Sequence, residues 1–275
     1  MNTEKKQFLA EKARLIRVDT IKAVHSAKAG HPGGSLSIAE ILSYLYFEEM
    51  NVDPSDPKKP DRDRFVLSKG HASPALYSVL AEKGFFDKEL LLTFRKNGSI
   101  LQGHPDMKHI PGVDMTTGSL GQGISAACGM ALAGKLSDKP FRVYAILGDG
   151  EIEEGQVWEA AMFARHYKLD NLCAFVDFNG LQVDGKIQDV IDPTPIDEKF
   201  RAFGWNVVCI DGSDLEEIEN AVENAKSTKE KPTAVIAKTV KGRGVSYMEN
   251  SVGWHGKAPN DEEYAVAMRE LGEEL

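Results

Sequence analysis

The sequence predicts an α/β fold: a parallel sheet with helices on both faces. Two short, almost uniformly apolar runs, residues 142–147 and 172–178, are typical of parallel strands buried on both faces. Residues 155–167, which lie between them, favour a helix. A strand–helix–strand unit of this kind is the building block of parallel sheets, because the intervening helix returns the chain to the same edge.

The other elements are expected to continue this alternation. An amphipathic helix should run to about Ala27, because its apolar residues recur at helical spacing. Small residues on one face of the helix expected at 118–136 should allow a neighbour to pack closely. The remaining expectations are a loop at 29–35, helices at 37–47, 74–83 and 214–226, strands at 64–67, 206–210 and 233–238, a Gly-rich segment at 241–260 and a terminal helix.

Composition narrows the class of protein. No Pro/Ser/Gly-rich linker divides the 275 residues, so we expect one domain spanning residues 1–275. The net charge of −9 and the absence of a basic patch argue against nucleic acid as a partner. No apolar stretch reaches membrane-spanning length, and the N-terminus, which has acidic residues among its basic ones, does not resemble a targeting signal. Cys128, Cys173 and Cys209 lack metal-ligand spacing and are expected to be buried thiols of a cytoplasmic protein.

Gly148-Asp149-Gly150, followed later by Asn179, is the most informative motif. Asp149 and Asn179 follow two neighbouring strands, and ligands of open parallel sheets bind at the carboxyl ends of the strands. Carboxylate and amide oxygens suit Mg²⁺ or Ca²⁺, and the glycines allow a ligand to approach closely. Alone, Gly-Asp-Gly and Asn-Gly are also common turns. The strand placement favours a metal clamp for a phosphorylated ligand.

Four histidines lie in loops next to Gly or Pro: His31, His71, His104 and His255. A single loop histidine is usually a solvated side chain, so each alone is weak evidence of function. They could act together only if their loops meet at one edge of the sheet. Residues 116–123 add a Gly-rich start to the small-residue helix, where free backbone amides could receive a ligand. No Gly-x-Gly-x-x-Gly follows the first strand, which argues against a nicotinamide cofactor.

Together these segments resemble the N-terminal part of transketolases, which depend on thiamine diphosphate. The matching stretches follow the family order over nearly the whole chain: Gly30-His31-Pro32-Gly33, Ser68-Lys69-Gly70-His71, residues 116–123, 148–155 and 177–185, and Trp254-His255-Gly256-Lys257-Ala258-Pro259. The resemblance implies the thiamine-diphosphate-binding fold and ketol transfer between sugar phosphates in pentose phosphate metabolism. Ser119 and Leu181 replace the Pro and Ile of many relatives, and both changes look tolerable.

The resemblance also assigns a metal site. Asp149 and Asn179 would bind Mg²⁺ through side-chain oxygens and Leu181 through its backbone carbonyl; Ca²⁺ or Mn²⁺ could substitute. Gly150 and Asn179 would lie against the diphosphate.

Further cofactor and substrate contacts follow from the same resemblance. His71 and His255 would lie near the diphosphate, and His255 would also reach the reacting centre. The expected contacts to the aminopyrimidine and thiazolium region are Gly118, Leu120 and Val183. The expected substrate and proton-transfer residues are His31 and His104, which would contact substrate hydroxyls, and Glu154, in a proton network at the subunit interface.

The sequence ends where the family's pyrimidine-binding domain should begin. We therefore expect that domain and the C-terminal domain on a partner chain, in an assembly of two copies of each chain. Two other readings stay open: a split thiamine-diphosphate transferase or synthase for an unusual sugar, and a non-catalytic cofactor-binding subunit.

Overall fold

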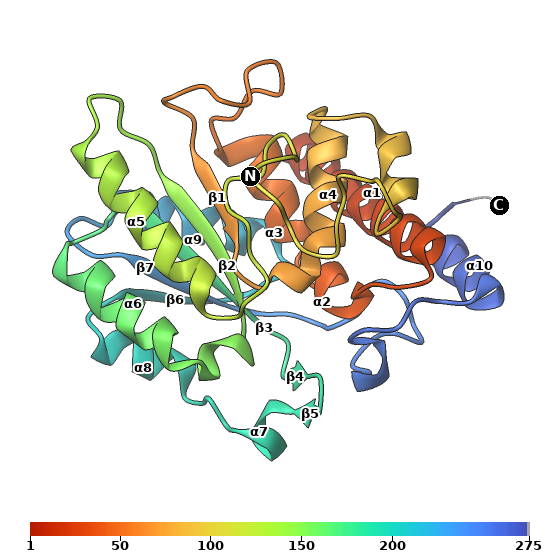
Figure 1. The fold of residues 1–275 in the computed structure, drawn as a ribbon. Coiled ribbons are helices and arrows are strands. Elements are labelled where there is room, and N and C mark those ends of the chain that lie inside the picture. Colours follow the sequence, from red (N-terminus) through yellow and green to blue (C-terminus); the bar gives the residue numbers. More distant parts are fainter. Residues whose placement is uncertain (274–275) are drawn as a thin grey trace.

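A computed structural model describes residues 1–273 and confirms the α/β fold. Its central sheet is parallel and has the strand order β1-β2-β3-β7-β6 (Figure 1). The strands are β1 (Arg64–Leu67), β2 (Val143–Gly148), β3 (Leu172–Phe178), β6 (Asn206–Asp211) and β7 (Thr233–Lys238). Gly148 on β2 is in register with Asp177 on β3, which in turn pairs with Ala237 on β7. The segments that follow these three strands therefore meet at one edge.

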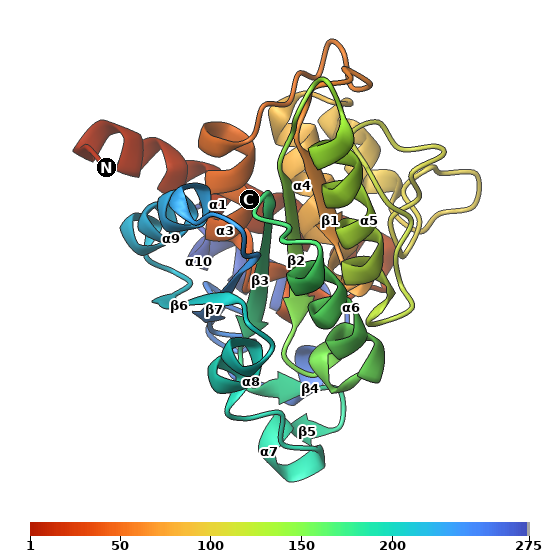
Figure 2. The same ribbon diagram turned by 90° about the vertical axis from the view of Figure 1, so that its left-hand side faces the viewer.

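Helices cover both faces of this sheet, as the apolar strand sequences predict. One face packs against α1 (Thr3–Ala27), α3 (Ala39–Tyr44), α4 (Ser73–Lys83) and α9 (Leu215–Ser227). The other packs against α5 (Gln122–Leu136), α6 (Gly155–His166) and α8 (Ile196–Ala202). Figure 2 shows α5 and α6 on the opposite side of the sheet from α1, α3 and α9. Alternate β2 residues serve the two cores: Tyr144 packs in the first and Ala145 in the second.

Local sequence fixes several helix ends. Asn2 begins α1 by accepting a hydrogen bond from the Lys5 backbone amide at 2.8 Å, and Asp214 caps α9 in the same way. Gly84 ends α4 with φ +98°, a conformation that favours glycine. Asn260 and Glu263 form a reciprocal capping box that begins α10 (Asp261–Glu270), and α10 packs on α1 through Met268.

Three expectations about helices were wrong. The loop expected at 29–35 contains α2 (Pro32–Leu36), which proline begins because its φ is already helical. The helix expected at 37–47 is divided into α3 and a π-helical turn, η1 (Leu45–Glu49). The helix expected from residue 118 begins only at Gln122, because Gly118 and Gly121 adopt φ of +146° and +82°.

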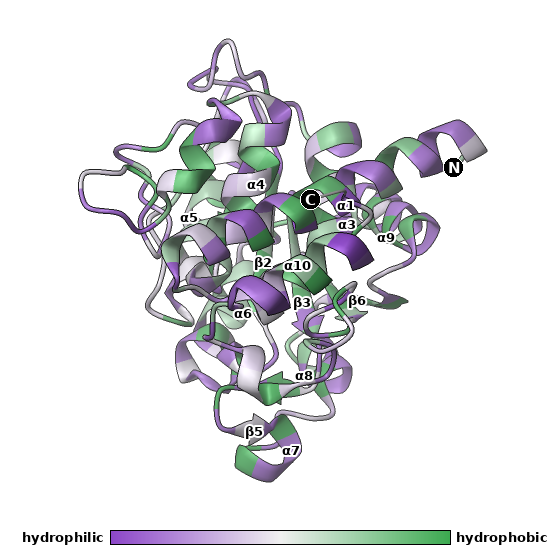
Figure 3. Ribbon diagram, turned by 90° about the vertical axis from the view of Figure 1, so that its right-hand side faces the viewer, coloured by the Kyte–Doolittle hydropathy of each residue, from purple (hydrophilic) through white to green (hydrophobic). Residues whose placement is uncertain are grey.

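Elements not predicted from the sequence are mostly short. They are α8, the hairpin β4 (Leu181–Gln182) and β5 (Gly185–Lys186), α7 (Ile187–Val190), and the 3₁₀ turns η2 (Gly70–Ala72), η3 (Lys88–Thr93), η4 (Glu151–Glu153) and η5 (Val252–Trp254). The hairpin and α7 project from the carboxyl edge of the sheet (Figure 1). Figure 3 shows apolar residues on this projection, where Val183, Val190 and Ile191 are exposed.

The cysteines are only partly as expected. Cys128 and Cys173 are buried, but Cys209 is exposed, so the expectation of a buried thiol was wrong there. Cys209 lies on β6, an edge strand of the sheet, which pairs with only one other strand, β7. In the part of the chain that the structure describes, no helix has both the length and the apolar character needed to span a membrane.

Candidate functional site

A cavity of about 130 Å³ lies at the carboxyl edge of β2 and β3. The predicted residues that line it are His71, Leu120, Asp149, Gly150, Asn179, Leu181, Val183 and His255. A larger cavity of about 730 Å³ lies beside β6 and α8, but none of the predicted site residues lines it. The smaller cavity is therefore the candidate site, because residues from five separate segments converge on it.

Asp149 is a buried carboxylate at the end of β2, with 2% of its surface exposed. Its oxygens accept hydrogen bonds from the backbone amides of Gly150 at 2.9 Å and Gly180 at 2.5 Å. Burial, with a smaller contribution from the nearby Asp177 carboxylate, raises the pKa of Asp149 to about 7. A bound cation would offset this cost of burying the negative charge.

Asn179 and Leu181 add neutral oxygen donors beside that carboxylate. The Asn179 side-chain amide donates to Asp177 at 2.9 Å, while its oxygen accepts from the Leu181 backbone amide at 3.1 Å. The Leu181 carbonyl accepts from Lys241 Nζ at 2.9 Å. Within residues 1–273 no cluster of three or more His, Cys, Asp or Glu side chains is arranged to hold a metal. A cation here would depend on one carboxylate, one amide oxygen and one carbonyl, all hard donors that fit Mg²⁺.

Three of the four predicted histidines come together beside this cavity. The ring centroids of His31 lie 5.3 Å from His71 and 5.5 Å from His255, and those of His71 and His255 are 5.1 Å apart. Burial is the main reason that the pKa of His31 falls to about 4, that of His255 to about 3, and that of His71 well below its ordinary value. All three imidazoles are therefore neutral near pH 7.

His104, Gly118 and Glu154 do not line the cavity. The His104 ring lies where a side chain on Gly118 would have to go, so these two residues touch. Burial and the nearby Arg95 guanidinium lower the pKa of His104. Glu154 is exposed and packs against Gly121, at the start of α5. The loop of Gly118 and Leu120 is held by Glu151, which accepts from the Gly121 backbone amide at 2.9 Å.

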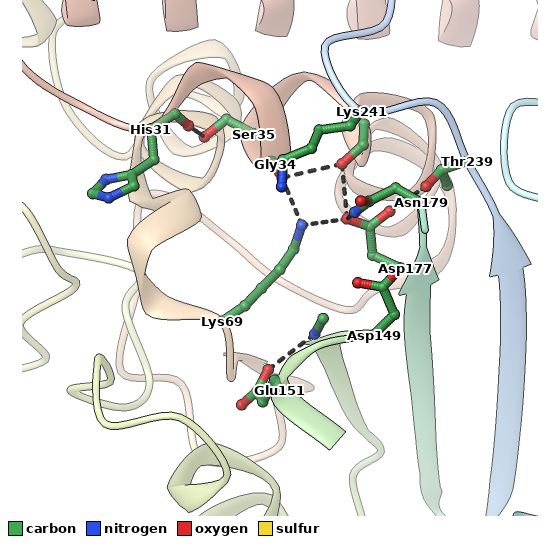
Figure 4. A network of polar contacts seen from close by, with 12 residues as sticks. His31, Gly34, Ser35, Lys69, Asp149, Glu151, Asp177, Asn179, Thr239 and Lys241 are labelled. Atoms are coloured by element: carbon green, nitrogen blue, oxygen red, sulfur yellow. Dashed lines mark hydrogen bonds and ion pairs between the residues drawn. The ribbon is translucent and has the colours of Figure 1, made fainter. Parts of the chain in front are cut away.

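Four charged residues that line the cavity were missed in the sequence: Lys69, Glu151, Asp177 and Lys241. Lys69 donates to Asp177 at 2.6 Å (Figure 4). Lys241 donates to His255 Nδ1 at 2.9 Å as well as to Leu181, and burial lowers its pKa to about 8. Lys69, Glu151 and Asp177 lie inside the stretches that resemble the family and Lys241 does not, but membership in a motif alone could not show which side chains point into the cavity.

The fold and this site define a thiamine-diphosphate-binding domain, and comparison with known proteins narrows the class. Residues 7–274 match the family model "Transketolase, thiamine diphosphate binding domain". The chain therefore belongs to the transketolase N-terminal family, as its motifs predict.

Similarity to individual proteins extends over the whole chain. A 6-deoxy-6-sulfo-D-fructose transketolase subunit from Clostridium sp. (strain MSTE9) is 48% identical, with 99% of each chain covered. An apulose-4-phosphate transketolase subunit from Phocaeicola vulgatus is 42% identical, covering 100% of this chain and 96% of the relative. The solved transketolase from Leishmania mexicana superposes with a TM-score of 0.92 at 32% identity, over 97% of this chain and 41% of that one.

Proposed function

We propose that this chain is the cofactor-holding subunit of a two-chain transketolase, which transfers a two-carbon ketol unit from a ketose phosphate to an aldose phosphate. One observation carries the proposal: the oxygens of Asp149, Asn179 and Leu181 and the ring of His255 lie around a single cavity. The full-length similarity to two proteins named as transketolase subunits supports it.

Asp149, Asn179 and the Leu181 carbonyl would hold Mg²⁺, with Ca²⁺ or Mn²⁺ as substitutes. Gly150, Asn179 and His71 would lie against the diphosphate, and Lys241 would offset its negative charge because its ammonium group already lies in the cavity. Gly118, Leu120 and Val183 would line the aminopyrimidine and thiazolium end. Thiamine diphosphate supplies the carbon nucleophile and the electron sink that ketol transfer needs.

The histidines would move protons. Ketol transfer requires a substrate hydroxyl to lose a proton as the carbon–carbon bond breaks and the acceptor oxygen to gain one. His255, held by Lys241, and His31, whose buried Nδ1 has no hydrogen-bond partner among the described residues, are placed for these steps. Both rings are neutral at pH 7 and so have an unprotonated nitrogen, although burial makes them weak bases in this chain alone. His104, which contacts Gly118 and lies outside the cavity, would contact a substrate hydroxyl.

We propose that residues 1–275 form a single domain and that a partner chain carries the pyrimidine-binding and C-terminal domains, with two copies of each chain in the assembly. The interface would include α5, α6 and Glu154. In support, Met162 and Phe163 of α6 are exposed. A cavity of about 330 Å³, lined by small α5 residues and Phe163, also lies between the two helices. An apolar surface of this kind is typical of a subunit interface.

The proposal has two versions, which differ in the sugar substrates. In the first, the enzyme acts on the sugar phosphates of pentose phosphate metabolism in the cytoplasm. The second is a specialised transketolase, and the names of the two full-length relatives, one for a sulfonated ketose and one for apulose-4-phosphate, favour testing it.

Reconstitution with the candidate partner chain, thiamine diphosphate and Mg²⁺ tests the proposal. A panel of pentulose and hexulose phosphates and a sulfonated ketose would serve as donors, with aldose phosphates as acceptors. We expect ketol transfer from at least one donor and none with the Asp149→Ala variant. Cofactor binding without transfer from any donor would support a non-catalytic subunit instead.

A further inference from the structure

Asp177 is the centre of a buried polar network directly behind the candidate metal site. None of its surface is exposed. One oxygen, Oδ2, accepts from Lys69 Nζ at 2.6 Å, from Ser37 Oγ at 2.8 Å and from the Asn179 amide at 2.9 Å. The other oxygen, Oδ1, accepts from the Thr239 hydroxyl. Figure 4 shows Lys69, Asn179 and Thr239 around this carboxylate.

These contacts determine which way the Asn179 amide faces. A carboxylate only accepts hydrogen bonds, so the group that Asn179 turns toward Asp177 must be its NH₂ and not its oxygen. The amide oxygen consequently points away from Asp177, where it accepts from the Leu181 backbone amide. That single contact leaves the oxygen a second lone pair for a cation.

The same contacts keep Asp177 itself from acting as a ligand. Its two oxygens already receive four hydrogen bonds. The Lys69 ammonium, itself buried, neutralises its charge and also donates to the Gly34 carbonyl at 2.6 Å. Asp149, in contrast, receives only backbone hydrogen bonds and has no ion-pair partner among the described residues. Three buried carboxylates therefore line the cavity. Asp177 is neutralised by Lys69, Glu151 accepts hydrogen bonds from Ser68 and from the Gly121 and Gly148 backbone amides, and Asp149 is the one free to take a cation.

We propose that Asp177 is a positioning residue that fixes the Asn179 amide with its oxygen toward the metal, while Lys69 neutralises Asp177 so that the cation binds at Asp149. This inference rests on the proposed function, because it presupposes a metal at Asp149 and Asn179. It adds a requirement that the metal ligands alone do not impose: position 179 must present a hydrogen-bond donor to Asp177.

The decisive variant is Asn179→Asp. A second carboxylate ligand ordinarily strengthens Mg²⁺ binding, since it adds negative charge and keeps a hard oxygen. Here it would place an acceptor against Asp177 Oδ2, where the Asn179 NH₂ now lies at 2.9 Å. We expect this variant to bind Mg²⁺ at least about tenfold more weakly than the wild type, the loss typical of a disturbed outer shell.

The experiment is a calorimetric titration of the assembled two-chain enzyme with Mg²⁺ and, separately, with Ca²⁺, in the presence of thiamine diphosphate. Asp177→Ala should weaken Mg²⁺ binding more than Ca²⁺ binding, because Mg²⁺ demands the stricter ligand geometry. Ser37→Ala is the matched control: it removes one hydrogen bond to the same oxygen but leaves the Asn179 contact, so Mg²⁺ affinity should stay close to wild type. Thermal melts without metal identify any variant that fails to fold.

Three outcomes would overturn the inference. Mg²⁺ binding by Asn179→Asp that is as tight as in the wild type, or tighter, would show that no donor is needed at this position. Equal losses of Mg²⁺ and Ca²⁺ affinity in folded Asp177→Ala and Ser37→Ala would mean that the network stabilises the site without orienting the Asn179 amide. A wild-type two-chain assembly that binds neither ion with thiamine diphosphate would remove the metal site itself, and that result contradicts the proposed function separately from the role of Asp177.

Discussion

The imidazole rings of His71 and His255 stack with an interplanar angle of 29° and a centroid separation of 5.1 Å. His71 follows β1, whereas His255 ends the turn η5, far beyond β7 in the sequence. Lys241 Nζ holds His255 through its Nδ1 and also contacts the Leu181 carbonyl. This arrangement links the histidine cluster directly to the candidate metal site.

Asp149→Ala should reduce Mg²⁺-dependent affinity for thiamine diphosphate by at least about tenfold to a hundredfold, because it removes the only charged ligand in the proposed set. Calorimetric titration of the assembled enzyme would measure this. Asp184→Ala is the matched control, since Asp184 is an exposed aspartate in the same hairpin region. Equal affinities for Asp149→Ala and wild type would remove Asp149 from the site.

His31→Ala, His104→Ala and His255→Ala should lower turnover of the reconstituted enzyme by about a hundredfold or more, the usual cost of losing proton transfer. Their melting temperatures should change little, because loop residues that act on substrate contribute little to a core. Rates and thermal melts on the same preparations decide between the two roles. Variants that melt early yet keep full specific activity would point to structural histidines.

The pH dependence of stability provides a test that needs no substrate. The pKa of His31 is about 4 in the folded chain, against an ordinary value of 6.5. Between these values the unfolded chain binds a proton that the folded chain does not, so the free energy of unfolding should fall as pH drops from about 6.5 to 4.

His31→Gln removes that proton uptake and should flatten the profile by about 1 to 2 kcal/mol, a range that allows for the partial solvent exposure of the ring. Chemical unfolding at several pH values would measure it. His166→Gln is the control, because His166 is exposed on α6. An unchanged profile in His31→Gln would mean that the ring is not protected from protonation.

The thiols should differ in reactivity. Burial raises the pKa of Cys128 and of Cys173 to about 12, whereas Cys209 is exposed. A thiol reagent should therefore label Cys209 rapidly in the native protein and the other two only after unfolding. Mass spectrometry of labelled peptides would show this, and rapid native labelling of Cys173 would contradict its position in the sheet.

The sequence alone predicted those parts of the structure that depend on a repeating pattern or on a local motif. All five strands of the central sheet lie where the sequence predicted them, β2 and β3 from apolar runs, and Gly148-Asp149-Gly150 with Asn179 identified the edge at which the cavity lies. The start of α5 was missed because the left-handed conformations of Gly118 and Gly121 depend on neighbouring loops that the sequence does not place.

Long-range partners could not be predicted for the same reason. Asp177 meets Lys69, Ser37 and Thr239 only after the chain has folded. The exposure of Cys209 likewise depends on strand order, because an apolar sequence does not reveal whether its strand lies at the centre or the edge of a sheet.

The most direct test of a site divided between two chains compares ketol transfer by the purified chain alone with transfer after addition of its partner chain, both with thiamine diphosphate and Mg²⁺. The proposed ligands of this chain would hold one end of the cofactor, and the pyrimidine-binding domain proposed for the partner chain would hold the other. We predict no measurable turnover by this chain alone and full activity at equal amounts of the two chains. Robust transfer by the isolated chain, or a mixture that stays inactive, would contradict the proposal.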